Sequence, residues 1–177
     1  MQWRSAVVGK ATFDLGHLWP FEFVFEVAEK AGKRSQSYRL FVEFGMHCFT
    51  RGIKREERYD GDRVYRDSRE ERLFDEERYN LSFRLPDIIR TIGTRRCFHT
   101  GHGNFFTIEL IDSEGNRREY SIYFKVSRKG RAGLTLFVQS AYIQNLIPRT
   151  RPKPRKPIKF SVIAFNTARG KPIRALQ

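Results

Sequence analysis

The sequence has little cysteine and no long hydrophobic run. Its 177 residues include two cysteines, Cys48 and Cys97, which are too few for a disulfide framework. No apolar segment approaches the roughly 18 residues that a membrane-spanning helix requires, which argues against a membrane partner. The N-terminal residues also lack the apolar stretch of a secretory signal peptide. Together these absences predict a cytoplasmic protein.

Acidic residues are missing from the last third of the chain. No Asp or Glu follows Glu119, whereas 13 of the 34 lysines and arginines do, and the net charge is +14. A surface of one sign attracts polyanions, because binding releases their condensed counterions. We therefore predict nucleic acid as the partner. An acidic protein, such as an antitoxin, is the second hypothesis.

The remaining composition is sufficient for a folded core. Hydrophobic residues make up 40% of the chain and aromatic residues 14%, including 16 Phe, so burial can offset the entropy lost on folding. A helix with proline in its first turn is expected at residues 85–92. The predicted fold class is α+β, with one or two helices on a mostly antiparallel sheet. Its strands are expected at residues 21–27, 38–44, 105–111, 118–126 and 134–142.

These elements predict one domain followed by a basic arm. Residues 1–147 are expected to form the domain, from an N-terminal hairpin, a charged insertion at 51–80 and a C-terminal meander. Within the insertion, residues 63–79 fit either a solvated helix or an ordered loop. Residues 148–177 are expected to form a basic, proline-rich arm, because four prolines within residues 148–157 favour an extended chain. Residues 158–165 are predicted to form one final strand.

Basic residues of the meander and of the arm are the expected nucleic-acid contacts. In the meander and its turns they combine with glycines that leave the backbone accessible, and in the arm they alternate with prolines. Aromatic residues lie among them, as base-stacking platforms would. The predicted contacts are Arg95, Lys125, Arg128, Lys129, Arg131, Arg149, Arg151, Lys153, Arg155 and Lys156.

Residues 95–104 carry the densest set of chemically active side chains. Two imidazoles, His99 and His102, follow Arg95 and Arg96 within a glycine-containing segment. One hypothesis is metal-independent cleavage of RNA, with one histidine as general base at the ribose 2′-hydroxyl and the other as general acid at the leaving oxygen. An arginine would then offset the developing phosphorane charge.

Two other interpretations of the same segment remain open. A zinc site could combine Cys48, Cys97, His99 and His102, with His47 as a further ligand, but the spacing does not match the usual paired motifs. Alternatively, the segment is a structural loop whose histidines lie on the surface. We predict neither a metal nor any other cofactor.

The strand at 134–142 ends in Ser140-Ala141-Tyr142, after the histidine-bearing segment. In this respect residues 85–145 resemble the barnase/EndoU/colicin/RelE group of small ribonuclease toxins. The resemblance implies a helix before a four-stranded antiparallel sheet, with histidine, basic and hydroxyl side chains on one sheet face. It implies the catalytic residues His99, His102, Arg96, Ser140 and Tyr142, and a role as a toxin or defence effector.

The sequence thus predicts a nucleic-acid-binding protein, with metal-independent endoribonuclease activity as the more specific hypothesis and RNA favoured over DNA. The alternative is a non-catalytic RNA- or DNA-binding subunit of a nucleoprotein assembly. Fragments formed from RNA in the presence of a chelator would favour the enzyme, and binding without cleavage would favour the subunit.

Overall fold

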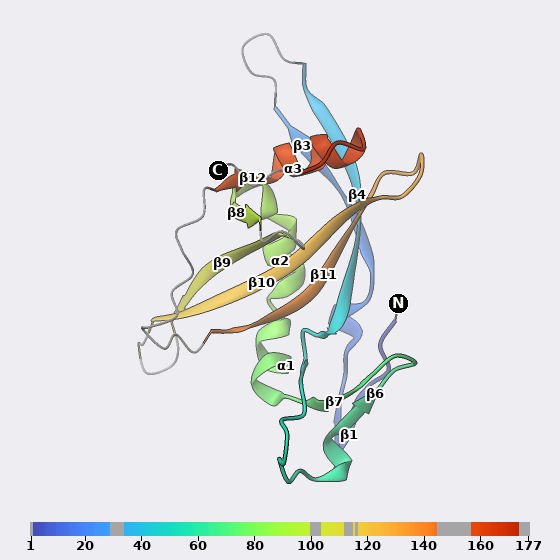
Figure 1. Ribbon diagram of the computed structural model, residues 1–177, viewed down its shortest axis with the longest axis vertical. Coiled ribbons are helices and arrows are strands. Elements are labelled where there is room, and N and C mark those ends of the chain that lie inside the picture. The colour runs from blue at the N-terminus through green and yellow to red at the C-terminus, as the bar shows by residue number, and fades with distance from the viewer. Residues whose placement is uncertain are drawn as a thin grey trace.

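A seven-stranded sheet forms the centre of the protein (Figure 1). The computed structural model describes residues 2–28, 34–99, 104–111, 115, 117–144 and 157–173. The sheet has the strand order β12-β8-β9-β10-β11-β4-β3. In the described part of the chain three α-helices accompany it: α1 (Glu76–Ser82), α2 (Leu85–Arg90) and α3 (Phe160–Ala168). The predicted α+β fold class is confirmed.

The predicted meander and hairpin both form, and they join into one sheet. The meander comprises β8 (Arg96–His99), β9 (Asn104–Ile111), β10 (Arg117–Arg128) and β11 (Leu134–Ile143), all paired antiparallel. The hairpin comprises β3 (Phe21–Val27) and β4 (Gln36–His47), also antiparallel. Strand β4 lies parallel to β11. This single parallel pairing places the N-terminal hairpin beside the end of the meander.

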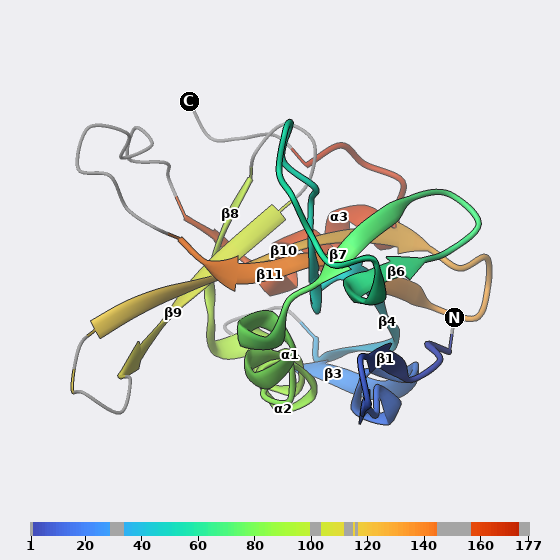
Figure 2. The same cartoon turned by 90° about the horizontal axis from the view of Figure 1, so that it is seen from below.

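The helices cover one face of this sheet, which we call the inner face. Alternate residues of the central strands are fully buried there, among them Val42 on β4, Phe124 on β10 and Leu136 on β11. Helix α3 reaches the same layer through Phe160, whose ring packs against Phe25 and Phe124. Figure 2 shows α1 and α2 on this side of the sheet. The opposite face, which we call the outward face, carries the other half of the alternation.

The charged insertion is built differently from either prediction. Residues 63–79 form no continuous helix: η2 (Gly61–Arg63) leads into β6 (Val64–Arg66) and β7 (Glu71–Phe74), and β5 (Thr50–Arg51) completes a second sheet in the order β5-β7-β6. An ion pair of 2.5 Å between Arg66 and Glu71 links the two longer strands. The helix begins only at Glu76, where the Asp75 carboxylate accepts a hydrogen bond from the backbone N–H of Arg78.

The predicted final strand is wrong except at its start. Only Ile158–Lys159 pair as a strand, β12, along β8. The chain then turns into α3, because Phe160, Ile163 and Ala164 follow helical spacing and are all buried. Residues 157–173 therefore belong to the same core as the meander, and the predicted division after residue 147 does not hold for them. The predicted proline-rich segment lies largely outside the described residues.

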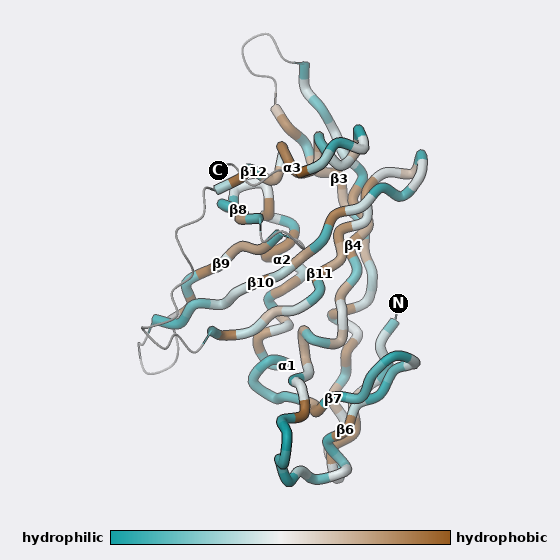
Figure 3. Tube along the Cα trace, in the orientation of Figure 1, coloured by the Kyte–Doolittle hydropathy of each residue, from teal (hydrophilic) through white to brown (hydrophobic). Residues whose placement is uncertain are grey.

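The short remaining elements lie at the periphery of the sheet. They are β1 (Ala6–Val8), β2 (Ala11–Phe13), η1 (Gly16–Leu18) and η3 (Ile92–Thr94). Figure 3 shows the hydrophobic stretches concentrated on the central strands and α2, and the hydrophilic ones around β6 and β7. Among the described residues no helix is long and apolar enough to cross a membrane.

Candidate nucleic-acid interface

Four aromatic side chains form a continuous row across the outward face of the meander. They are Phe98 on β8, Phe105 on β9, Tyr123 on β10 and Tyr142 on β11, and we call them the aromatic ladder. Successive ring centroids lie 5.3, 5.3 and 5.6 Å apart, with interplanar angles of 31°, 23° and 14°. The ladder follows from strand register, because Phe98 pairs with Phe105, and Phe105 pairs with Tyr123.

The rings are offset rather than fully superimposed. Parallel aromatic rings in contact are separated by roughly 3.5–4 Å, so centroid distances near 5.5 Å imply a lateral slip of about 4 Å. Each ring therefore covers only part of its neighbour. All four side chains are partly exposed. Part of each ring is thus exposed on the outward face.

Arg78 closes the Tyr142 end of the ladder. Its guanidinium carbon lies 4.8 Å from the centre of the Tyr142 ring, and its Nη1 donates hydrogen bonds to the carbonyls of His47 and Thr50. Burial lowers the pKa of Arg78, but a guanidinium stays charged at neutral pH. Burial also raises the pKa of Tyr123 to about 12, so this phenol is neutral, and it accepts a hydrogen bond of 2.8 Å from Gln144.

The basic residues predicted for the meander lie in and after β10. Lys125 shares the outward face with Tyr123, two residues away on the same strand. Lys125, Arg128 and Arg131 are exposed and form no ion pair within the described ranges. Lys129 places its ammonium 3.7 Å from the centre of the Phe41 ring on β4. The predicted contacts Arg149, Arg151, Lys153, Arg155 and Lys156 lie outside the described residues.

The predicted catalytic residues are not brought together. Phe98 is on the outward face, so its neighbour His99 points to the inner face, where its Nδ1 lies 3.1 Å from Oδ1 of the buried Asn104. Ser140 pairs with Tyr123, which places it on the outward face with Tyr142. The sheet therefore separates His99 from both hydroxyl groups. Arg96 is exposed on the outward side of β8, and His102 lies outside the described residues.

The two cysteines are unsuited to bind a metal in this fold. Both are free and buried, and burial raises the pKa of each thiol to about 12, whereas zinc binds the thiolate. Cys48 Sγ donates to the carbonyl of Val138. Among the residues that the structure describes, no three His, Cys, Asp or Glu side chains are grouped closely enough to hold a metal ion.

The sequence analysis missed a histidine–carboxylate pair on the outward face. His47 Nε2 lies 2.6 Å from Oε1 of Glu70, and the register places His47 beside Ser140. The pair borders a cavity of about 320 Å³, which Glu43 and Asp67 also line. No sequence spacing indicates this pair, because its members are 23 positions apart in the chain. His47 ends β4 of the seven-stranded sheet, whereas Glu70 directly precedes β7 of the second sheet.

Comparison with known proteins identifies a family. Residues 5–168 match the model of the YjaZ family. Protein YjaZ of Escherichia coli (strain K12) is 30% identical over 160 residues, which are 89% of this chain and 86% of that protein. No solved structure matches the chain.

Proposed function

The chain belongs to the YjaZ family, and we propose that its aromatic ladder binds single-stranded nucleic acid, RNA in the first place, without cleaving it. The observation that carries this proposal is the row of four partly exposed, slip-stacked rings on the outward face of the sheet. Unpaired bases stack on aromatic side chains in many proteins that bind single strands, and the stacking tolerates any base sequence.

The ladder offers bases a rigid surface. Each ring is held against its neighbours, so little side-chain entropy remains to be lost on binding. Arg78 and the carbonyls of His47 and Thr50 fix the Tyr142 end. A base that inserts at this face therefore meets rings that already have their bound orientation.

The charge distribution supports a polyanionic ligand. Lys125, Arg128 and Arg131 lie on or next to the strand that carries Tyr123, and within the described ranges no carboxylate neutralises them. Such cations attract phosphates through counterion release. The net charge of +14 acts in the same direction at longer range.

The geometry favours binding over cleavage. The ribonuclease mechanism requires histidine and hydroxyl groups at one phosphodiester, yet His99 and Tyr142 lie on opposite faces of the sheet. His47 is on the correct face, but its cavity also holds the carboxylates of Glu43, Asp67 and Glu70. Among the described lining residues Arg69 offsets one of these three carboxylates, so the cavity keeps an excess of negative charge and is a poor site for cleaving a phosphodiester.

Fluorescence anisotropy with a labelled single-stranded RNA tests the proposal. We expect Tyr123→Leu to weaken binding by roughly 5- to 150-fold, since one base–aromatic stack is worth about 1–3 kcal/mol. Tyr59→Leu is the matched control, because Tyr59 is an exposed tyrosine of the charged insertion and is not part of the ladder. Its affinity should stay within twofold of that of the unaltered protein. DNA of the same sequence shows whether the sugar matters.

Two results would contradict the proposal. One is equal RNA affinity of Tyr123→Leu and Tyr59→Leu, with both variants folded by circular dichroism. The other is cutting of RNA in a chelator, abolished by His99→Ala, which would restore the ribonuclease hypothesis. The binding proposal is supported if the RNA stays intact and its affinity depends on Tyr123.

A further inference from the structure

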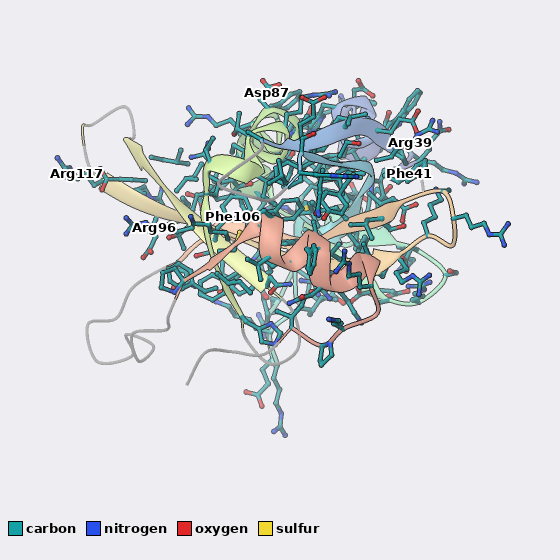
Figure 4. All side chains as sticks on the ribbon, turned by 90° about the horizontal axis from the view of Figure 1, so that it is seen from above. Arg39, Phe41, Asp87, Arg96, Phe106 and Arg117 are labelled. Atoms are coloured by element: carbon teal, nitrogen blue, oxygen red, sulfur yellow. The ribbon has the colours of Figure 1, made fainter. Side chains whose placement is uncertain are left out.

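A basic pocket lies between the end of β3 and the starts of β8 and α3. It has a volume of about 700 Å³ and is formed by the end of β3, the segment from α2 to η3, the start of β8 and the start of α3. Figure 4 labels Arg96, which lines this pocket, well away from Arg39 and Phe41. This volume suits a ligand of nucleotide size.

Cations dominate the lining of this pocket. Arg90, Arg95, Arg96 and Lys159 contribute four positive charges, and Glu26 contributes the one carboxylate found among the described residues of the lining. The Arg90 guanidinium stacks 4.2 Å above the ring of Phe21. Arg96 and Lys159 are directly opposite each other in the pairing of β8 with β12 and both are exposed. Adjacent like charges without a neutralising partner favour a bound anion.

Arg95 supplies the most specific indication of a ligand. Its Nη2 donates a hydrogen bond of 3.1 Å to Oγ1 of Thr91, which orients the guanidinium within the pocket wall. Its Nε is shielded from solvent and has no hydrogen-bond partner among the described residues. A buried donor left unpaired is unfavourable by about 1–3 kcal/mol, so an acceptor from a ligand would stabilise this arrangement.

The start of α3 adds donors of the same kind. Lys159 and Ser161 line the pocket and flank the N-terminus of this nine-residue helix. No side chain of the described residues caps this end, and no acidic residue lies in the first turn of the helix. The unpaired N–H groups and the positive end of the helix dipole both favour a bound phosphate.

The remaining wall is apolar and already formed. Phe25, Val27 and Ala28 line it. A Cβ on Gly93 would lie 2.5 Å from the ring of Phe25, so the η3 backbone packs directly on that ring. The pocket thus combines donors for an anion with a surface for a sugar or base.

We propose that this pocket binds the phosphomonoester group of a nucleotide-sized ligand through Arg95, Arg96 and Lys159. The group belongs either to a free mononucleotide or to the phosphorylated end of a nucleic-acid strand. The inference does not depend on the aromatic ladder, because none of the four ladder residues lines this pocket.

Isothermal titration calorimetry with inorganic phosphate and with adenosine 5′-monophosphate tests the pocket at fixed ionic strength. Arg95→Gln should weaken both ligands about tenfold or more, since a charge-assisted hydrogen bond is removed. Lys159→Gln is a second variant, and it should fold normally because the Lys159 side chain is exposed. Arg55→Gln removes the same charge from an exposed position outside the pocket and should change either affinity less than twofold.

Oligonucleotides then distinguish the two sources of phosphate. If RNA with a 5′-phosphate binds more tightly than RNA with a 5′-hydroxyl, and Arg95→Gln abolishes the difference, the ligand is a strand end. If the two bind equally while the mononucleotide binds at the pocket, the ligand is a free nucleotide.

The inference is overturned if no phosphate ligand binds at millimolar concentration. It is also overturned if Arg95→Gln and Lys159→Gln both bind as Arg55→Gln does. Tyr123→Leu should leave phosphate binding unchanged, so failure of the ladder proposal and failure of the pocket proposal are separate results.

Discussion

Arg78 shows how one side chain ties the ladder to the rest of the fold. The residue belongs to α1, yet its guanidinium holds the turn between β4 and β5 through two carbonyls and covers the ring of Tyr142. A lysine offers neither the planar stacking surface nor the forked donors. The orientation of the ladder therefore depends on an arginine outside the meander.

The ion pair between Arg51 and Glu57 makes stability depend on pH. The Arg51 guanidinium hydrogen-bonds to the Glu57 carboxylate and holds its pKa at about 2, below the ordinary value of 4.5. Because the folded-state pKa is the lower one, this pair stabilises the fold above about pH 4.5, and the stabilisation disappears as the pH falls toward 2. We expect Glu57→Gln to be less stable than the unaltered protein at pH 7, and we expect this difference to shrink steadily as the pH falls from about 4.5 to 2.

Urea unfolding at a series of pH values measures this difference. Glu56→Gln is the matched control, because the Glu56 carboxylate is highly exposed and reaches Arg55 only at 3.8 Å. It should follow the unaltered protein throughout. A stability gap for Glu57→Gln that stays constant from pH 7 to 2 would contradict the assignment.

At the scale of elements, the turn between β10 and β11 is shaped to dock on β4. Gly133 has φ = 137°, and a Cβ there would lie 2.4 Å from the carbonyl oxygen of Arg39. Gly130 in the same turn has φ = 57° but faces open space. Substitutions at these two glycines therefore distinguish the effect of the backbone conformation from the effect of close packing against β4.

Gly133→Ala should therefore destabilise the protein more than Gly130→Ala. We expect about 2–6 kcal/mol for Gly133→Ala, from backbone strain together with overpacking against β4. Gly130→Ala should cost about 1–2 kcal/mol, from the left-handed conformation alone. Equal destabilisation of the two variants in equilibrium urea unfolding would show that β4 does not approach the turn this closely.

At the scale of the whole molecule, the C-terminal region contains both basic residues and side chains of the hydrophobic core. Residues 158–168 contribute β12 and α3 to the sheet and its inner layer. Deleting residues 148–177 would thus remove core side chains such as Phe160 along with the basic residues. Substitution is the appropriate test of the arm.

A variant with Arg149, Arg151, Lys153, Arg155 and Lys156 changed to Gln should keep the fold and bind RNA more weakly. The slope of log K against log salt should flatten by about 0.7 for each RNA phosphate that the variant no longer neutralises. A control variant with Arg55→Gln and Arg58→Gln should retain the slope. If the variant with five substitutions keeps the salt slope of the unaltered protein, these five residues do not belong to the interface.

Local pattern was enough to predict several elements of the fold. The alternation at residues 21–27 predicted β3 with its observed bounds, and the proline after Leu85 predicted α2 near its observed start. The meander followed from three alternating segments joined by turn residues. Each of these depends on neighbours close in sequence. The short apolar run at 158–165 was ambiguous, since burial on one side suits a strand or a helix of that length.

The site depended on pairings between distant strands. The amino-acid sequence alone determined the fold class, the excess of positive charge and the presence of histidines and aromatic residues in the meander. Only tertiary structure decided that β4 pairs parallel with β11, that Phe98, Phe105 and Tyr123 align, and that His99 faces away from Tyr142. The physical reason is that a shift of one residue in register moves a side chain to the other face of a sheet, and the sequence of one strand does not specify the register of its partner.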